Sequence, residues 1–379
     1  MNHQIPSPAQ PRGRRRRMSV GLASFLAIAS LLAIGVANAS AAWSLQTTPN
    51  PHATLNELND VSCLAGGECF SVGSVGSPSA TTAQRWNGTE WKTQPTAALP
   101  TPPLGSTGHS LVSISCTSTT ACTAVGYQTI SGVKKALAER WDGASWKTQE
   151  VPGSKGPLQA VTCVSATDCL AVGQTGGSAR WNGKEWSTST APFVFGTPEQ
   201  GTLSDLSCTS ASFCVAVGTY GQSSLIFSWN GSIWTSQTSP TGSLLGVSCT
   251  ATYACTAVGV MSGPTGTLIP LITRWDGTKW TTQKAAYSAG AEFAGLSGVS
   301  CASQTVCYAT GATRSGPNME TLAEVWNGTS WEVQSTPNPV GAVASFFRGV
   351  SCISITVCES VGVSRNGANV TTTLAERAS

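Results

Sequence analysis

Short apolar stretches alternate with glycine and with polar turns along most of this sequence, and they predict β-strands. Two examples are Leu-Gly-Val-Ser-Cys at 245–249 and Cys-Thr-Ala-Val-Gly at 255–259. Both are short and rich in small or β-branched residues, which is typical of strands bounded by turns. From residue 40 onward, no apolar repeat of 3.6 residues runs for ten residues or more, so helical repeats are not expected. The fold is predicted to be all-β.

The same pattern recurs seven times. Each copy holds two cysteines separated by five residues, and the first cysteines of successive copies lie 41 to 53 residues apart. This period is in the range of β-propeller blades. Each copy divides into four predicted strands. The first ends at the first Cys and the second begins at the second Cys. The third ends at a Trp followed by Asn-Gly or Asp-Gly, and the fourth begins at the next Trp.

The Asn-Gly and Asp-Gly pairs predict tight hairpins, because these residues tolerate the positive φ that such turns need. The spacing leaves two geometries open. If 87–90 forms a four-residue loop, Trp86 and Trp91 become a cross-strand pair. If Asn87 and Gly88 alone form the turn, Trp86 pairs with Thr89 instead.

The number of strands predicts a closed ring. Six copies are complete, but the seventh stops after its third strand, at 373–377. The missing fourth strand matches the segment 42–51, which has the form of 330–339. An N-terminal strand that completes the last blade would remove exposed sheet edges. We therefore predict a seven-bladed β-propeller with four-stranded blades over residues 40–379, closed by its N-terminal strand.

The first 39 residues have the form of an export signal. A basic run at 14–17 precedes an apolar segment at 18–36, and Ala-Asn-Ala at 37–39 fits a cleavage site. The sequence therefore predicts a protein that is secreted or held in the cell envelope, with no membrane span after cleavage. Because the apolar segment is long enough to cross a bilayer, an uncleaved N-terminal membrane anchor is the alternative.

Charge argues against nucleic-acid binding. Removing residues 1–39 leaves 16 basic and 18 acidic residues, a net charge of −2, and no basic face is indicated. Charged residues are 10% of the chain, where about a quarter is typical. Ser, Thr, Gly and Asn supply the polarity instead, as is common in extracellular β proteins.

An even number of cysteines behind an export signal indicates disulfides. We expect each cysteine to bond the other member of its own pair, across the first hairpin of its blade. The expected disulfides are Cys63/Cys69, Cys116/Cys122, Cys163/Cys169, Cys208/Cys214, Cys249/Cys255, Cys301/Cys307 and Cys352/Cys358. Zinc would need four ligands brought together, but the pairs belong to separate blades and the chain has three histidines. No metal site and no cofactor are predicted.

Candidates for catalysis are sparse. The chain has no Gly-x-Ser-x-Gly, no His-Glu-x-x-His and no phosphate-binding glycine loop. His109 is interpreted as a solvated loop residue. Arginine recurs before the first Trp of a hairpin, and glutamate often precedes it, so we interpret both as scaffold or as blade-to-blade contacts. These residues are Arg85, Arg140, Arg180, Arg274, Arg377, Glu139, Glu324 and Glu376. The tryptophans occupy fixed hairpin positions and are assigned to sheet packing.

The segments that vary from copy to copy predict the ligand site. The second turn of each blade and the connection to the next blade lie on one face of the disc, and binding residues concentrate on loops held by a rigid scaffold. The candidate ligand residues are Tyr127, Lys134, Lys135, Phe193, Phe195, Tyr220, Tyr287, Phe293, Arg314, Phe346, Phe347 and Arg348. The alternative for each is that it fills a gap between blades.

The combination Ser-Cys-x5-Cys-x-Ala-Val-Gly and Trp-Asn-Gly-x-x-Trp resembles a largely uncharacterised group of secreted bacterial repeat proteins. More distantly, the Ala-Val-Gly strand and the Asn/Asp-Gly-x-x-Trp hairpin are similar to Asp-box propellers, such as sialidases and photosystem assembly factors, and to kelch blades. The resemblance implies a propeller. It carries over no sialidase residues, because that family's nucleophilic Tyr and acid cannot be placed here.

We therefore expect a monomeric, non-enzymatic secreted propeller that binds a cell-envelope glycan or a surface protein through its variable face. The first alternative is a propeller glycoside hydrolase or lyase. It would need paired carboxylates, for which only the dispersed Asp205, Glu199 and Glu292 are candidates. The second alternative is a passive component of the envelope or spore with no discrete ligand.

Overall fold

A computed structural model describes Met1 and residues 41–99, 108–154, 156–174, 177–190 and 201–379. The chain divides into two units, Met1–Ala39 and Ser40–Ser379. The second unit is all-β, and the described residues form 28 strands and no helix. Its strands lie in antiparallel groups of four, called groups 1 to 7 below.

Groups 1 to 4 follow one another along the chain. Group 1 contains β2 (Asn56–Cys63), β3 (Cys69–Val75), β4 (Ala80–Trp86) and β5 (Trp91–Gln94). Group 2 contains β6 (Ser110–Ser118), β7 (Ala121–Ile130), β8 (Val133–Trp141) and β9 (Trp146–Gln149). Group 3 contains β10 (Leu158–Ser165), β11 (Asp168–Gly173), β12 (Gly177–Trp181) and β13 (Trp186–Thr190). Group 4 contains β14 (Gly201–Ser210), β15 (Phe213–Tyr220), β16 (Ser223–Trp229) and β17 (Trp234–Ser236).

Groups 5 to 7 bring in the N-terminal strand. Group 5 contains β18 (Ser243–Ala251), β19 (Ala254–Ser262), β20 (Leu268–Trp275) and β21 (Trp280–Gln283). Group 6 contains β22 (Phe293–Cys301), β23 (Cys307–Arg314), β24 (Glu320–Trp326) and β25 (Trp331–Gln334). Group 7 contains β26 (Ala342–Cys352), β27 (Cys358–Asn366), β28 (Thr371–Ala378) and β1 (Trp43–Gln46). Strand β1 pairs with β28 from Trp43–Ala378 to Gln46–Ala375. One parallel pairing, Leu268–Phe293, joins groups 5 and 6.

The cysteine hairpins are longer than predicted in four groups. The prediction that the second strand begins at the second cysteine holds for β3, β23 and β27. It is wrong for groups 2 to 5, where the strand begins one residue earlier. The second cysteines of these groups are Cys122, Cys169, Cys214 and Cys255. A bulge after the first cysteine lets the ladder continue by one more pair, such as Ser165 with Asp168.

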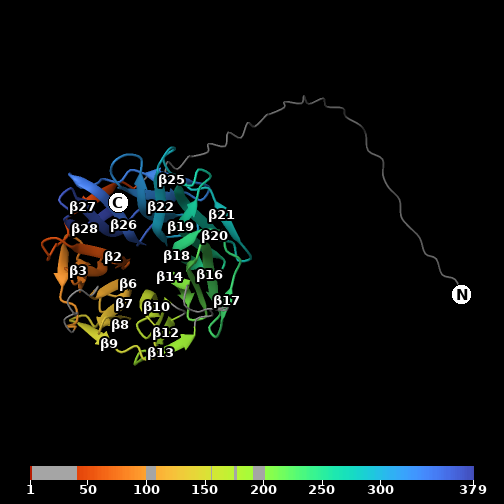
Figure 1. The fold of residues 1–379 in the computed structure, drawn as a ribbon. Coiled ribbons are helices and arrows are strands. Elements are labelled where there is room, and N and C mark those ends of the chain that lie inside the picture. The colour runs from red at the N-terminus through yellow and green to blue at the C-terminus, as the bar shows by residue number, and fades with distance from the viewer. Residues whose placement is uncertain (2–40, 100–107, 155, 175–176, 191–200) are drawn as a thin grey trace, which may run out of the picture. The chain divides into compact units, whose positions relative to one another are not determined.

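The first strand of each group lies toward a common centre, where β2, β6, β10, β14, β18, β22 and β26 are grouped in Figure 1. Each of these strands contacts the first strand of the next group, and β26 contacts β2. The core lies between neighbouring groups. For example, Phe70 and Val72 of β3 pack against Leu111 and Ile114 of β6 and against Trp141 of β8.

The glycine of the repeated Ala-Val-Gly is required by a close approach of two strands. At Gly126, an added Cβ would lie 2.0 Å from the carbonyl oxygen of Ser110 on the neighbouring strand. The pairing of β6 and β7 shifts register just after this point, between Leu111 and Ser113. A bulge of this kind bends a strand and leaves no room for a side chain. The same approach occurs at Gly259, whose added Cβ would lie 1.9 Å from the oxygen of Ser243.

Candidate functional site

The antiparallel order of each group gives the domain two distinct faces. The loop between the two cysteines and the Asn/Asp-Gly turn lie on one face, here called the turn face. The loop between the second and third strands and the connection to the next group lie on the other, here called the variable face. The variable face is where the sequence predicts a ligand.

On the turn face, the cysteines of each pair are cross-strand partners in the first hairpin. Seven disulfides join them, and no free cysteine is present among the described residues. Each bond closes a loop between residues six apart in sequence. Within the same described ranges, no group of His, Cys, Asp and Glu is arranged to hold a metal ion. These cysteines therefore form structural bridges.

The second cysteine of each pair is also a core residue, which the sequence reasoning missed. All seven second cysteines are buried, whereas the first cysteines are partly exposed. Cys169 packs in the core between groups 2 and 3, Cys214 in the core between groups 3 and 4, and Cys255 in the core between groups 4 and 5. Alternation along the second strand turns this side chain toward the neighbouring group. These sulfurs are therefore not accessible to a ligand.

The turn face also resolves the geometry of the tryptophan hairpins. Trp86 faces Trp91 in the strand register, with ring centroids 6.0 Å apart. The loop is therefore the four-residue one. The Asn87 side-chain oxygen accepts hydrogen bonds from the backbone N–H groups of Thr89 (2.9 Å) and Glu90 (3.0 Å). Asn or Asp is needed at this position because its side chain closes the turn.

The recurring arginines connect neighbouring groups. Arg140 lies over the ring of Trp181 in the next group, 4.5 Å from its centroid, and donates to the carbonyl oxygen of Ala166 at 2.7 Å. Arg274 lies 4.6 Å over Trp326 and donates to the oxygen of Gln304 at 2.6 Å. Such stacking is stabilising when the cation is partly desolvated. This geometry supports the interpretation of these arginines as contacts between blades.

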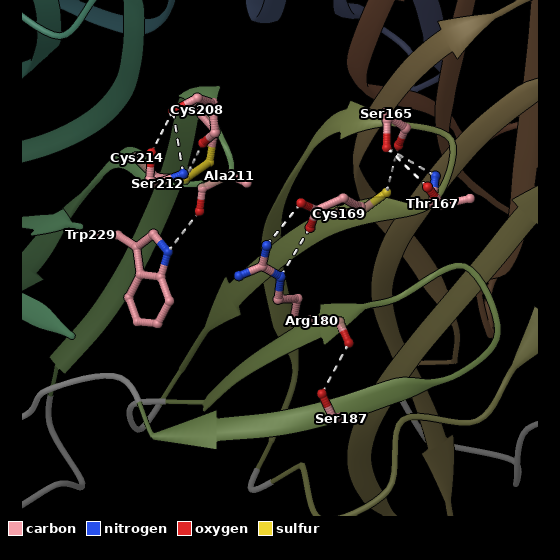
Figure 2. A network of polar contacts seen from close by, with 12 residues as sticks. Ser165, Thr167, Cys169, Arg180, Ser187, Cys208, Ala211, Ser212, Cys214 and Trp229 are labelled. Atoms are coloured by element: carbon pink, nitrogen blue, oxygen red, sulfur yellow. Dashed lines mark hydrogen bonds and ion pairs between the residues drawn. A yellow bond between two sulfur atoms is a disulfide. The ribbon is translucent and has the colours of Figure 1, made fainter. Parts of the chain in front are cut away.

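Three of the recurring arginines have an acid on their own group. One of them, Arg377, pairs with Glu359 at 3.2 Å and still lies over Trp86 of group 1, 5.8 Å from its ring centroid. Arg180 pairs with Asp168 at 2.8 Å, and Figure 2 shows it beside Trp229 of the next group. Arg85 pairs with Glu68 at 3.0 Å. Both Arg180 and Arg85 remain on the turn face, and their charges are neutralised within the scaffold.

The serine before the first cysteine, present in six of the seven copies, is a connecting residue that the sequence reasoning missed. Ser248 accepts a hydrogen bond from the backbone N–H of Cys301 at 3.0 Å, and Ser300 accepts one from Cys352 at 3.0 Å. The same bond joins the chain ends, where Ser351 accepts from Cys63 at 2.9 Å. The repetition of Ser-Cys was the available signal, because a structural disulfide by itself does not require a preceding serine.

Buried glutamates make a further contact between groups. Glu139 accepts from the N–H of Ala97 at 3.0 Å, and Glu324 accepts from the N–H of Ala286 at 2.7 Å. Both side chains are fully buried. Burial raises the pKa of Glu139 to about 7 and that of Glu324 to about 8.

The equivalent position in group 7 lacks this contact. Ala97 and Ala286 lie three residues after Gln94 and Gln283, and the equivalent residue is Pro337, which has no N–H. Both carboxyl oxygens of Glu376 are buried without a hydrogen-bond partner among the described residues. Burial, followed by repulsion from Glu359, raises the pKa of Glu376 to about 8. Glu376 is therefore a neutral acid at pH 7.

The carboxylates considered for catalysis have separate surroundings. Asp205 accepts from the N–H groups of Leu206 (2.8 Å) and Val247 (2.7 Å), so it joins β14 to β18. Burial raises its pKa to about 7, and repulsion from Asp60 adds to the shift. Glu292 instead forms an exposed ion pair with Arg314 at 3.1 Å. The third residue of that prediction, Glu199, lies outside the described residues.

The interpretation of His109 as a solvated residue is wrong. Its side chain is 3% exposed, and its Nδ1 accepts a hydrogen bond from the backbone N–H of Thr129 at 3.1 Å. Gly108 and His109, just before β6, lie against β7 at this point, because Thr129 also donates to the carbonyl oxygen of Gly108 at 2.6 Å. The histidine therefore holds the residues just before β6 to the β7–β8 hairpin.

The structure places the predicted ligand residues in several separate positions. Tyr127, Lys134 and Lys135 lie together on the β7–β8 hairpin, where the Lys134 ammonium is 4.0 Å from the Tyr127 ring centroid. Phe293, the first residue of β22, and Arg314, the last residue of β23, are cross-strand partners in group 6. Tyr220, at the end of β15, and Tyr287, in the connection after β21, are partly buried. Phe193 and Phe195 lie outside the described residues.

Three consecutive candidates on β26 have different environments. Phe347 is fully buried and packs 5.8 Å from the Trp43 ring, so its assignment to the ligand face is corrected to the core. Alternation along the strand turns Arg348 the other way. It pairs with Glu57 at 3.1 Å and also donates to Asn59. Phe346 is partly buried.

Two grooves lie beside the predicted residues. One, of about 620 Å³, includes Lys134, Lys135, Ala136 and Val151 in its lining. The other, of about 840 Å³, includes Tyr287, Trp326 and Val333 and runs between groups 5 and 6. Both volumes are in the range of ligand pockets.

No helix in the described part of the chain is long and apolar enough to span a membrane.

No protein-family model matches this sequence, and a search of curated proteins gives no match. Solved structures are similar in fold. YCF48 bound to a D1 peptide has a TM-score of 0.58 and 15% identity, with 89% of this chain and 96% of that chain covered. YCF48 from Cyanidioschyzon merolae has a TM-score of 0.57, 14% identity and coverage of 89% and 99%. The WD40 repeats of RRP9 have a TM-score of 0.60, 11% identity and coverage of 89% and 98%. These similarities show that the chain has a β-propeller fold.

Proposed function

We propose that residues 40–379 form a closed seven-bladed propeller, exported from the cell, that binds a segment of another protein on its variable face. The seven groups supply the blades, and three contacts between the chain ends support closure. Strand β1 pairs with β28, Ser351 accepts from Cys63, and Trp91 donates to Gln46 at 2.7 Å. A ring leaves each blade with a neighbour on both sides.

Export is supported by the bonded cysteines. Seven disulfides in one domain are typical of an oxidising compartment, and residues 1–39 have the composition of a signal peptide. We propose cleavage after Ala39. The intact mass of the exported protein tests this point. A mass that starts at Ser40 is expected, whereas a retained 1–39 segment would indicate the membrane anchor instead.

The observation that carries the binding proposal is a pair of exposed lysines on the variable face, beside a groove. On the turn face, repeated polar groups bond within the scaffold, as Asn87 does with Thr89 and Arg140 with Ala166. On the variable face, the charged residues differ between groups. The exposed Lys134 and Lys135 there have no acidic partner within hydrogen-bonding reach among the described residues. Exposed side chains that a rigid scaffold positions, but that form no ion pair within it, are available to bind a partner.

A protein segment is favoured over a glycan by what lines the variable face. The groove beside Lys134 and Lys135 combines apolar side chains with charged ones, as protein-binding surfaces do. The propeller fold is also able to hold a peptide, since YCF48 is seen with a D1 peptide bound. The Asp205 carboxylate accepts hydrogen bonds that join two strands, and the Glu292 carboxylate forms a surface ion pair. Neither arrangement favours a role in glycoside hydrolysis.

The test compares the two faces. The oxidised protein is screened against a displayed library of random peptides and against a glycan array. Two variants are screened beside it, one with Lys134, Lys135 and Arg314 changed to Ala, and one with Lys92, Lys184 and Lys279 of the turn face changed to Ala. We expect peptide binding that is lost in the first variant and kept in the second. Binding to glycans alone, or binding lost only in the second variant, would overturn the proposal.

A further inference from the structure

The β7–β8 hairpin has an open strand edge on the variable face. Strand β8 pairs with β7 along its whole length, from Ile130–Val133 to Cys122–Trp141. Its outer neighbour β9 pairs only with Ala138–Trp141. Residues 133–137 therefore have no strand on their outer side among the described residues. An edge of this kind exposes backbone N–H and C=O groups that can pair with another chain.

The other six groups cover this position. In each of them, a single β-bridge joins two segments. One is the start of the third strand or the turn before it, and the other lies at or near the first strand of the next group. The bridges are Ser79–Gly108, Gln174–Thr202, Ser223–Thr241, Leu268–Phe293, Met319–Ala344 and Leu55–Thr371. Within the described residues of group 2 and its connection to group 3, no such bridge is formed.

Side chains explain why the edge of β8 is open. In three groups, a threonine of the third strand bonds a threonine that follows the fourth strand. The pairs are Thr81–Thr96 (2.9 Å), Thr321–Thr336 (2.8 Å) and Thr373–Thr48 (2.7 Å). In group 4, Ser239 similarly donates to the carbonyl oxygen of Ser224 at 2.6 Å.

The equivalent positions in group 2 are Ala136 and Val151, which have no hydroxyl. No hydroxyl pair therefore joins the start of β8 to the segment that follows Gln149, the last residue of β9. The segment after β9 forms the far wall of the groove of about 620 Å³. Group 5 also lacks the hydroxyls, with Pro270 and Ala285, but its edge is protected differently. Proline has no N–H to offer an added strand, and Phe293 covers Leu268.

The open edge is basic and partly apolar. Lys134 and Lys135 are exposed on it, and neither forms an ion pair among the described residues. Lys134 lies over the ring of Tyr127. Val133 is 59% exposed and Ile130 is 39% exposed. Glu150 is the acid in the described lining of the groove, so the lysines are not neutralised in full.

We propose that an extended, acidic segment of a partner protein adds to β8 as a further strand opposite residues 133–137. This inference rests on the proposed function and names the partner's chemistry. Main-chain hydrogen bonds would supply affinity, and alternate side chains would supply specificity. A segment of five residues would span about 17 Å at roughly 3.3 Å per residue. Acidic residues in it would face Lys134 and Lys135, and its apolar residues would contact Val133 and Ile130.

Charge excludes two other occupants. A second copy pairing through the same edge would bring the lysines of both copies together, and like charges on facing strands are destabilising. The N-terminal segment of this chain carries five arginines and no acid over residues 1–39, so it would be repelled by the same lysines.

The test starts from a displayed library of random decapeptides selected on the oxidised protein. Selected peptides are synthesised in two forms, one normal and one with alternate backbone nitrogens methylated. They are measured on the unchanged protein, on K134E/K135E and on K184E/K279E. The last variant makes the same charge change at exposed turn-face positions. All three proteins must unfold at the same denaturant concentration.

We expect selected peptides rich in Asp and Glu. Binding should weaken about tenfold or more in K134E/K135E, stay within about twofold in K184E/K279E, and weaken about tenfold or more when the peptide nitrogens are methylated. Binding that survives methylation, or that is unchanged in K134E/K135E, would overturn this inference and leave the proposed function standing. If no peptide binds any form of the protein, both fail.

Discussion

The two faces of this domain use the same kinds of residue for different purposes. On the turn face, Arg140 and Arg274 each stack on a tryptophan of the next group and donate to its backbone. On the variable face, Lys134 and Lys135 are exposed, and the structure shows no acid paired with either among the described residues. The recurring arginines are used by the scaffold, whereas Lys134 and Lys135, which have no counterpart in the other groups, are not paired within it.

The comparison shows how to separate stability from binding in a repeat protein. Several residues that recur at one position contact the next group, as Arg140 and Ser248 do, so their loss should lower the free energy of unfolding. A residue that interrupts the repeat, such as Ala136 in place of a threonine, changes what the surface offers to a partner.

Removing the aromatic ring of Trp43 should have the largest effect on stability. The side chain is buried and lies against Tyr308 and Phe347, with ring centroids 6.2 and 5.8 Å away. Trp43→Ala should lower the free energy of unfolding by about 3–5 kcal/mol, measured by guanidinium titration of the oxidised protein. Leu45→Ala on the same strand is the control, because Leu45 is 42% exposed, and it should change stability by less than about 1 kcal/mol. Equal effects of the two changes would contradict closure by β1.

Removing one disulfide should have a smaller effect. Cys116→Ser combined with Cys122→Ser opens a loop between residues six apart, and the chain-entropy relation gives about 2 kcal/mol for so short a loop. Peptide affinity should be unchanged, since the bridge lies on the turn face. A loss of affinity at unchanged stability would mean that the turn face takes part in binding.

Glu376 should make stability depend on pH. Its pKa is about 8 in the folded protein and 4.5 in an ordinary glutamate, so the folded state binds the proton more strongly than the unfolded state. Its contribution to stability is therefore complete below about pH 4.5 and is lost as the pH rises toward 8. Glu376→Gln should raise the free energy of unfolding at pH 8 by about 1–2 kcal/mol and change it little at pH 4.5.

The equivalent glutamine in group 1 indicates why this substitution should be accommodated. Gln84 donates to the carbonyl oxygen of Pro49 at 2.8 Å, and Pro49 occupies the position of Pro337 in the repeat. The matched control is Glu139→Gln, because Glu139 already accepts the N–H of Ala97. Denaturant titrations at both pH values should show a smaller gain for the control. An equal gain for both would refute the role given to Pro337.

Removing one serine contact should have the smallest effect. Ser248→Ala deletes the acceptor of the Cys301 N–H and should lower the free energy of unfolding by about 1 kcal/mol. Ser187, exposed on β13, provides the control, and Ser187→Ala should change stability by less than about 0.5 kcal/mol. A Ser248→Ala protein as stable as the control would show that the contact contributes nothing.

Strands, turns and cysteine pairs could be predicted because each depends on local residues that recur. The alternation of apolar and polar residues, the Asn-Gly turns and the fixed cysteine spacing each identify one hairpin. The burial of His109 could not be predicted in this way, because it depends on contacts of Gly108 and His109 with Thr129, at positions that do not follow the repeat. Phe347 was misplaced because three adjacent residues of one strand were assigned to one face, although side chains alternate along a strand.

The open edge of β8 could not be predicted from the sequence either, although the sequence identifies Lys134 and Lys135 as candidate ligand residues. Its existence depends on two small differences, Ala136 and Val151 in place of hydroxyl residues, at positions 15 residues apart. The effect of these two residues on the edge becomes clear only from the structure, in which the equivalent threonines of other groups form a hydrogen bond, as Thr81 and Thr96 do. Comparing equivalent positions within the chain is what shows the difference.

The most direct test of the division between the faces is the affinity of one selected peptide for two charge-reversed proteins of equal stability. K134E/K135E changes the variable face, and K184E/K279E changes the turn face. We predict that binding is about tenfold or more weaker for the first protein and within about twofold of the unchanged protein for the second. Equal loss in both, or loss only in K184E/K279E, would contradict this prediction.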